Sequence, residues 1–223
     1  IMASWSNNLL IDGNSILNVS PAASSGAGIF LDNSSGSVIR NNTINGVLGY
    51  CTTCYNVYGI GLSTAVVNTI ISNNRINRIH YTAGGKWWAY GIDVTTSSNN
   101  ANILISNNMV SNVAHDYGMN TTWSTYGIRI TSTGNVRVYH NSVFLRGSYF
   151  VPSSGAGQSA ALLVNTSTAN IDVRNNVFAN RMYGASGSKS YALYVATNPS
   201  TIPLSALDYN NYDVSGTSQG VLA

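Results

Sequence analysis

The chain has 223 residues, of which 44% are hydrophobic and only 8% are charged, and its formal net charge is +3. The basic residues are scattered rather than clustered, which argues against a nucleic-acid-binding protein. No run of about 20 apolar residues is present, so no membrane-spanning helix is expected.

An Asn-Asn pair, or a close variant of it, recurs along the chain. The pairs begin at positions 7, 41, 73, 107, 140, 175 and 210, with steps of 34, 32, 34, 33, 35 and 35 residues. Such a regular interval is typical of a repeat architecture. The repeat units are residues 7–40, 41–72, 73–106, 107–139, 140–174, 175–209 and a partial unit at 210–223.

Each unit is expected to contain three short strands. A Gly-Ile motif opens the first strand, in YGIGL at Tyr58, YGIDV at Tyr90 and YGIRI at Tyr126. Apolar residues then alternate at period two, as at Ile103 and Ile105, on the way to the Asn-Asn pair. Helical repeats of similar length are disfavoured, because glutamate is absent and Asn, Ser, Thr and Gly are abundant.

The pattern YGI-x-(I/V/L)…(I/V)-x-(I/V)-x-N-N-x-(I/V) resembles the right-handed parallel β-helix repeat of pectate-lyase-like proteins. The resemblance extends from about residue 7 to residue 213. It implies an all-β, single-stranded, right-handed parallel β-helix of about six to seven coils, and the usual hand of β crossovers agrees with it. We expect one domain over residues 1–223, cut from a longer chain because the pattern starts and stops inside a coil. The fold does not fix the function, because lyases, hydrolases, adhesins and tail spikes share it.

Stacking of the coils about 4.8 Å apart would place equivalent residues above one another. We expect a ladder of hydrogen-bonded side chains at the corner after the second strand, where asparagine also tolerates a left-handed backbone. The residues assigned to this ladder are Asn41, Asn73, Asn107, His140, Asn175 and Asn210. His140 replaces an amide in this column and is interpreted as structural.

Two pairs of opposite charge occupy equivalent places in successive coils. Asp93 and Arg129 share a position in the first strand, and Arg137 and Asp172 share one in the second. We expect both to be exposed ion pairs between coils, each worth less than about 1 kcal/mol.

The long connections all follow the third strand, so stacking would bring them to one face. They are rich in aromatic residues, which suit stacking on the apolar faces of sugars or contact with a protein partner. The ligand-binding candidates are Trp87, Trp88, Tyr81, Tyr117, Trp123 and Tyr149. Packing of these rings against the coils is the alternative, and the sequence leaves both open.

The two cysteines, Cys51 and Cys54, lie in one of these loops. A disulfide across the loop is expected if their α-carbons come within reach. No second Cys or His pair lies near them, so a zinc site is not expected.

The catalytic groups of the related enzymes are not recognisable. Pectate-lyase relatives bind calcium through clustered acidic residues and galacturonase relatives pair carboxylates, whereas this chain shows no acidic cluster, and no metal or cofactor is expected. Weak catalytic candidates are His115, Asp116 and Tyr117, with Lys86 and Arg78 in neighbouring coils.

Two functions therefore remain open. The first is a non-catalytic module of a secreted or cell-surface adhesin, stalk or fibre that binds glycans through the aromatic loop face. The second is a polysaccharide lyase or glycoside hydrolase with a cleft beside the long loops. The Asn-, Ser- and Thr-rich composition favours an extracellular or cell-surface location. Open coil ends expose strand edges, which would pair with flanking coils or with further copies in a filament.

Overall fold

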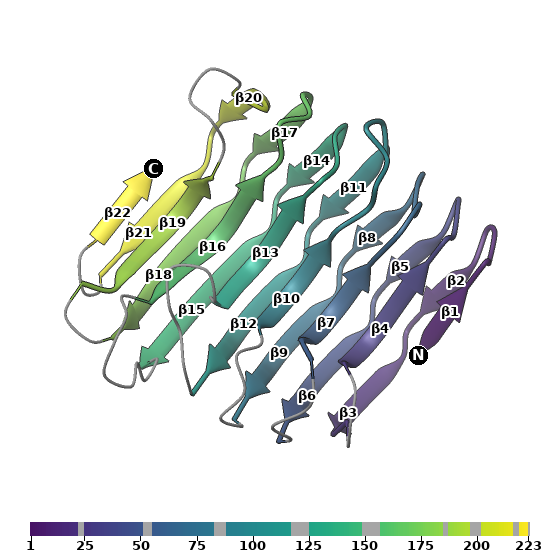
Figure 1. Ribbon diagram of the computed structural model, residues 1–223, viewed down its shortest axis with the longest axis horizontal. Helices are drawn as coiled ribbons and strands as arrows, with labels where there is room; N and C mark the ends of the chain where they lie inside the picture. The colour runs from purple at the N-terminus through teal and green to yellow at the C-terminus, as the bar shows by residue number, and fades with distance from the viewer. Residues whose placement is uncertain are drawn as a thin grey trace.

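The protein is a parallel β-helix in which each coil contributes one strand to each of three parallel sheets (Figure 1). The structure is a computed structural model that describes residues 1–21, 25–50, 55–82, 88–116, 125–148, 157–184, 187–196, 202–215 and 219–222. The described part contains no helix with the length and hydropathy needed to cross a membrane.

In the described part of the chain the sheets contain eight, seven and seven strands, which corresponds to about seven coils. The first sheet is β1 (Met2–Ser4), β4 (Gly26–Asp32), β7 (Val57–Leu62), β10 (Ala89–Val94), β13 (Thr125–Thr131), β16 (Gln158–Asn165), β19 (Lys189–Val195) and β22 (Gln219–Leu222). The second is β2 (Leu10–Asp12), β5 (Val38–Arg40), β8 (Ile70–Ser72), β11 (Ile103–Ser106), β14 (Val136–Tyr139), β17 (Ile171–Arg174) and β20 (Leu204–Asp208). The third is β3 (Ser15–Val19), β6 (Thr43–Gly49), β9 (Arg75–Tyr81), β12 (Met109–His115), β15 (Ser142–Ser148), β18 (Val177–Tyr183) and β21 (Asn211–Val214).

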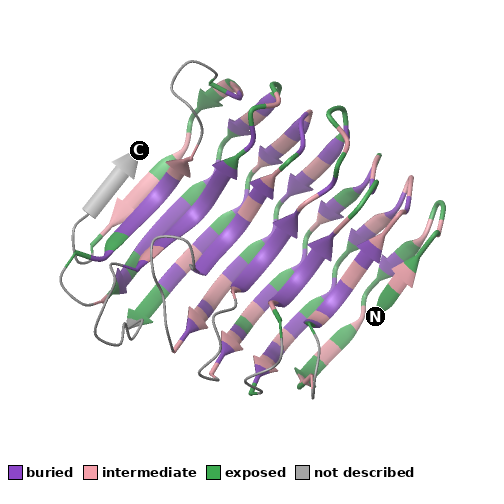
Figure 2. Cartoon of the chain, viewed as in Figure 1, coloured by how far each residue is buried: buried purple, intermediate pink, exposed green. Residues whose placement is uncertain are grey.

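The core is built from columns of branched apolar side chains that follow the repeat. Ile60, Ile92 and Ile128 are register partners in the first sheet, and all are fully buried. Figure 2 shows the central first-sheet strands β7, β10 and β16 as nearly continuously buried, whereas burial in the other sheets is mixed with exposure. The predicted all-β repeat with three strands per unit is confirmed.

The glycine of the Gly-Ile motif is required by close packing between sheets. A Cβ atom on Gly59 would lie 2.4 Å from Cγ2 of Ile76 and 2.5 Å from the carbonyl oxygen of Gly91 in the next coil. Such contacts are too short for carbon, so the first sheet approaches the third only where this residue is small.

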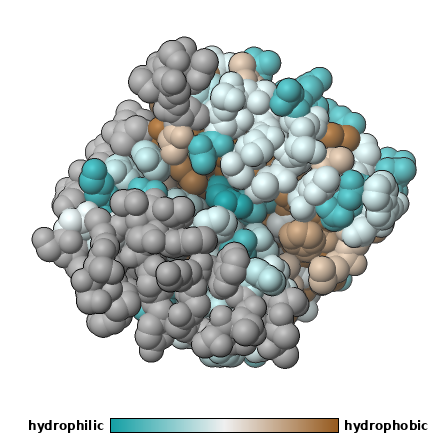
Figure 3. Space-filling view, viewed as in Figure 1, coloured by the Kyte–Doolittle hydropathy of each residue, from teal (hydrophilic) through white to brown (hydrophobic). Residues whose placement is uncertain are grey.

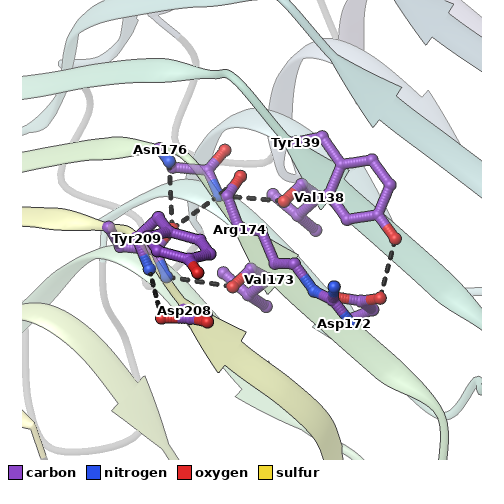
Figure 4. Close-up of polar contacts among 9 residues, drawn as sticks. Val138, Tyr139, Asp172, Val173, Arg174, Asn176, Asp208 and Tyr209 are labelled. Atoms are coloured by element: carbon purple, nitrogen blue, oxygen red, sulfur yellow. Dashed lines mark hydrogen bonds and ion pairs between the residues drawn. The ribbon is translucent and has the colours of Figure 1, made fainter.

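The asparagine ladder exists, but in the five coils from Asn41-Asn42 to Asn175-Asn176 the second residue of the pair forms it. Its members are Asn14, Asn42, Asn74, Asn108, Asn141, Asn176 and Asn210. In each step the amide nitrogen donates to the Oδ1 atom of the next asparagine at 2.9–3.0 Å. Figure 4 shows one rung, in which Asn176 Nδ2 also donates to the carbonyl oxygen of Val138 at 2.8 Å.

The predicted ladder was therefore wrong by one residue, except at Asn210. The residues assigned to it stand at the corner itself, exposed, with φ between 55° and 58°: Asn41, Asn73, Asn107, His140 and Asn175. A corner residue turns the backbone through the left-handed region and points to solvent, so the residue after it points inward. The left-handed conformation expected at this corner is confirmed.

Candidate functional site

Two of the predicted site residues lie inside the coil. Tyr81 and His115 are 0% and 1% exposed, and their rings stack at a centroid distance of 5.1 Å. Both side chains face the interior from the ends of β9 and β12, so neither lies on the loop face where a ligand-binding role for Tyr81 and a catalytic role for His115 were predicted.

The other candidates that the structure describes have local partners. Trp88 is half-buried, with its ring centroid 5.9 Å from that of Tyr90. Asp116 Oδ1 lies 2.7 Å from Nε2 of His80, a residue that the sequence analysis missed because it belongs to the preceding coil. Arg78 has φ 58° and donates from Nη2 to Oδ1 of Asn18 at 2.8 Å. The candidates that lie outside the described residues are Cys51, Cys54, Lys86, Trp87, Tyr117, Trp123 and Tyr149.

The outer side of the first sheet carries a buried ion pair among tyrosines. Arg129 donates from Nε and Nη2 to the two carboxylate oxygens of Asp93, at 2.6 and 2.9 Å. The two side chains are only 13% and 5% exposed, so the predicted pair is present but is not a surface pair. The guanidinium carbon lies 4.1 Å from the ring centroid of Tyr90. Burial raises the pKa of the Tyr58 phenol beside it to about 12, and burial raises the pKa of Tyr90 as well.

The second predicted charge pair does not form. Arg137 and Asp172 are register partners, as expected. The Asp172 carboxylate instead accepts from Nε of Arg174 at 2.8 Å and from the hydroxyl of Tyr139 at 2.7 Å (Figure 4). Arg137 donates to Oδ1 of Asn102. The Asp172 carboxylate is therefore paired with Arg174, which lies on the same strand, rather than with Arg137 in the preceding coil.

Every side-chain carboxylate of the chain already has a donor. The chain has seven aspartates and no glutamate, and the structure describes all of them. Four lie in ion pairs with an arginine: Asp12, Asp93, Asp172 and Asp213. A fifth, Asp116, contacts Nε2 of His80 through Oδ1. The other two, Asp32 and Asp208, accept from the Asn33 amide and the Tyr209 backbone amide. Within the described ranges, no three His, Cys, Asp or Glu residues are grouped to hold a metal ion.

The outer side of the third sheet is hollowed into an open trough of about 420 Å³ across β6, β9 and β12. We call it the third-sheet trough. Its lining residues are Thr43, Ile44, Asn45, Arg75, Ile76, Asn77, Met109 and Ser111. Sequence reasoning missed this site because its residues belong to the regular strands rather than to the long loops.

A column of left-handed residues runs beside the third-sheet trough. Asn18, Gly46, Arg78 and Asn112 have φ between 51° and 89°, and the strand pairing skips this column. An extra left-handed residue bends a strand as a β-bulge does. The column ends at β15. There the equivalent residue is Leu145, which is fully buried and does not have a positive φ. The trough therefore lies over the strands that share the bulge.

A family model for a right-handed β-helix region matches residues 1–201. The chain belongs to the right-handed β-helix family. The match confirms the resemblance seen in the repeat, including the hand of the coil. Neither the comparison with curated proteins nor that with solved structures gave a match. Because this fold hosts many activities, the function of this β-helix is argued from its surface.

In the third-sheet trough, the side-chain oxygen atoms of Asn45 and Asn77 accept hydrogen bonds from neighbouring residues, whereas some N–H donors have no partner. In this β-helix, Asn77 Nδ2 donates to Oδ1 of Asn45 at 2.9 Å. Asn77 Oδ1 in turn accepts from the Ser111 hydroxyl at 3.0 Å and from the Asn112 amide at 2.6 Å. The Asn45 amide nitrogen and the Arg75 guanidinium have no hydrogen-bond partner in the described part of the chain. The trough can therefore offer amide and guanidinium N–H groups to a ligand.

Proposed function

We propose that the chain is a non-catalytic β-helix module of a secreted or cell-surface protein, and that it binds a glycan in the third-sheet trough. One observation carries the proposal: an open groove is lined by amide, hydroxyl and guanidinium groups. Such groups match the hydroxyls of a sugar chain, and a shallow groove across parallel strands accommodates an extended polymer. Met109, which is 54% exposed, adds an apolar surface for the carbon face of a sugar ring.

The polar character of the surface supports a hydrophilic ligand. The described surface seen in Figure 3 is mostly hydrophilic or neutral, and its hydrophobic patches are small. The Asn-, Ser- and Thr-rich composition supports the extracellular location in the same way. The trough replaces the aromatic loop face as the proposed binding surface, because Tyr81 is in the core and Trp88 packs against Tyr90.

The state of the ionisable groups supports a binding role over catalysis. Acid–base cleavage of a glycosidic bond uses two carboxyl groups that face the substrate. Here the seven carboxylates are engaged by donors, and His115 is inside the coil. Among the residues that the structure describes, no comparable arrangement favours the alternative of a lyase or hydrolase beside the loops.

The test is binding to a panel of soluble oligosaccharides, measured by calorimetry, with product formation followed in parallel. Asn45→Ala should weaken binding by about two- to tenfold, which corresponds to the loss of one hydrogen bond. Asn165→Ala is the matched control, because Asn165 is exposed at the end of β16 on another sheet. Equal effects of the two substitutions would reject the trough as the site, and cleavage of any panel member would reject the non-catalytic role.

A further inference from the structure

We infer that the two open ends of the coil are complementary, so that copies of this chain stack head to tail and the coil continues across each junction. The ends lie opposite each other along the axis, with β1, β2 and β3 at one end and β20, β21 and β22 at the other (Figure 1). A head-to-tail contact along one axis leaves a free end after every addition, so it produces an open filament. The inference is independent of the glycan-binding function proposed above.

The first argument is that the two terminal strands of the first sheet would share one level. β22 pairs with the first part of β19 and ends with Leu222 beside Leu193. β1 pairs only with the last part of β4 and begins with Met2 beside Phe30. Leu193 and Ile29 belong to one column of register partners that runs through the first sheet. In a stack, β22 would therefore lie beside β4 of the next copy as far as Ile29, and β1 of that copy already lies beside the rest.

The other two sheets then continue without a missing or doubled strand. With β22 and β1 on one level, β20 would meet β2 of the next copy and β21 would meet β3. Among the described residues, only Ile1 would be displaced, because it lies opposite Ile29 between its hydrogen bonds to Gly28 and Phe30. Ile1 is 47% exposed, so its displacement disturbs little packing.

The second argument is a pocket at the place that β22 would occupy. This open, largely apolar pocket of about 300 Å³ is lined by Met2, Ser25, Ala27, Phe30 and Tyr55. It lies beside the first part of β4, where no described strand pairs with β4 on the side of β1. The pocket therefore marks the half of a strand that the first level of the coil lacks, and β22 of a second copy supplies a strand at that position.

The third argument is the polarity of the asparagine ladder. In every step the backbone N–H and the amide nitrogen of one asparagine donate to Oδ1 of the asparagine in the next coil. The ladder begins at Asn14, whose Oδ1 accepts no hydrogen bond from a described residue. It ends at Asn210, whose backbone N–H has no acceptor among the described residues. A head-to-tail contact joins this donor to this acceptor, whereas a head-to-head contact would join two acceptors.

The fourth argument is the apolar core at the open ends. Leu207 is the last member of the inward column of the second sheet and is 37% exposed, whereas the two members before it, Val138 and Val173, are fully buried. Ile11 is the first member of the same column. Stacking would place Leu207 on Ile11 of the next copy and would remove its apolar surface from water, which favours association.

Two aspartates at the junction oppose stacking. Asp12 and Asp208 are the first and last members of one outer column of the second sheet, so they would face each other across the junction. Charges at the edges of sheets commonly limit edge-to-edge association. We therefore expect a reversible association that added salt strengthens, because salt screens the repulsion between the two carboxylates.

Sedimentation velocity and electron microscopy of the 223-residue chain over a range of protein and salt concentrations test the inference. We expect rods of constant width whose length grows in steps of about 34 Å, the height of seven coils spaced about 4.8 Å apart. A single monomeric species at all protein concentrations up to about 1 mM would overturn the inference. Particles that grow in width rather than in length would overturn it as well.

Leu207→Glu and Ile70→Glu are the matched variants. The two side chains are 37% and 39% exposed, but Leu207 lies at the open end and Ile70 lies on the outer face of β8. Leu207→Glu would bury a charge in the junction and should weaken association at least about tenfold, whereas Ile70→Glu should leave it nearly unchanged. Asp208→Asn removes the repulsion with Asp12 and should strengthen association about two- to tenfold.

Thermal unfolding of the three variants checks that each retains the fold. Equal effects of Leu207→Glu and Ile70→Glu on association would show that the open ends are not the interface. Weaker association of Asp208→Asn would contradict the apposition of the two aspartates and, with it, the proposed register of the stack.

Discussion

Replacing Asn108 by alanine tests the ladder, because this residue lies in the middle of the coil and is 1% exposed. Its amide nitrogen donates to the carbonyl oxygen of Ile71 and to Oδ1 of Asn141, both at 3.0 Å. Its Oδ1 atom accepts from the backbone and side-chain nitrogens of Asn74, at 3.0 and 2.9 Å. One side chain therefore makes four hydrogen bonds that join three coils.

The expected loss follows from the groups left behind. Asn108→Ala would leave the backbone N–H and the amide N–H of Asn74 and the carbonyl of Ile71 without their partners. Each buried polar group left unsatisfied costs about 1–3 kcal/mol, and a water molecule entering the vacated space would recover part of this. We therefore expect the free energy of unfolding to fall by about 3–5 kcal/mol.

Urea denaturation followed by circular dichroism measures the change, and Asn107→Ala is the control from the adjacent position. Asn107 is exposed, has φ 56°, and its side chain forms no hydrogen bond that the structure records. Alanine there should cost only about 1–2 kcal/mol, from the strain of a left-handed backbone. Equal losses for the two variants, or a larger loss for Asn107→Ala, would refute the assignment of the ladder to the second residue of each pair.

Three further substitutions probe the packing of the first sheet. Arg129→Met leaves the Asp93 carboxylate buried and unpaired, so we expect a loss of about 3–5 kcal/mol by denaturation, most of it recovered in the double variant with Asp93→Asn. Tyr58 has a pKa of about 12, above that of the unfolded chain, so its contribution to stability is complete below about pH 10 and is lost as the pH rises toward 12. Tyr58→Phe should flatten the fall in melting temperature over that window, and an unchanged profile would contradict the assignment. Gly59→Ala should lower the free energy of unfolding by about 1–3 kcal/mol, because the alanine Cβ would lie 2.5 Å from the Gly91 carbonyl oxygen. An unchanged free energy of unfolding would show that the sheets can separate there.

The period of the sequence was sufficient to predict the coil. Residues that lie 28 to 36 positions apart, such as Asp93 and Arg129, are register partners in the structure. The ladder was placed one residue early because both residues of the pair recur with the same period. The distinguishing signal was present: His140 interrupts the first column, whereas the column from Asn42 to Asn176, which includes Asn141, contains asparagine only. An unbroken column indicates a buried position that accepts only one side chain.

Burial of the outer faces could not be predicted from the same pattern. The repeat shows that Asp93 points away from the core, but not whether other residues cover that side of the sheet. The Asp93 side chain was predicted to be exposed, but it is only 5% exposed. Likewise, Tyr81 was counted with a long loop, although it ends β9 and packs on His115 inside the coil. A boundary shifted by one residue reverses the direction of a strand side chain.

The third-sheet trough shows where a repeat fold leaves room for function. The inner columns must keep their residue types, because each coil packs on the next with the same geometry. The outer columns have no such requirement, and in the third sheet one of them runs from Leu17 through Asn45, Asn77 and Ser111 to Phe144. The left-handed column beside it stops at β15 although the sequence period continues. The period therefore predicts the coiled scaffold. A binding surface is to be sought where the backbone conformation changes from one coil to the next although the period is kept.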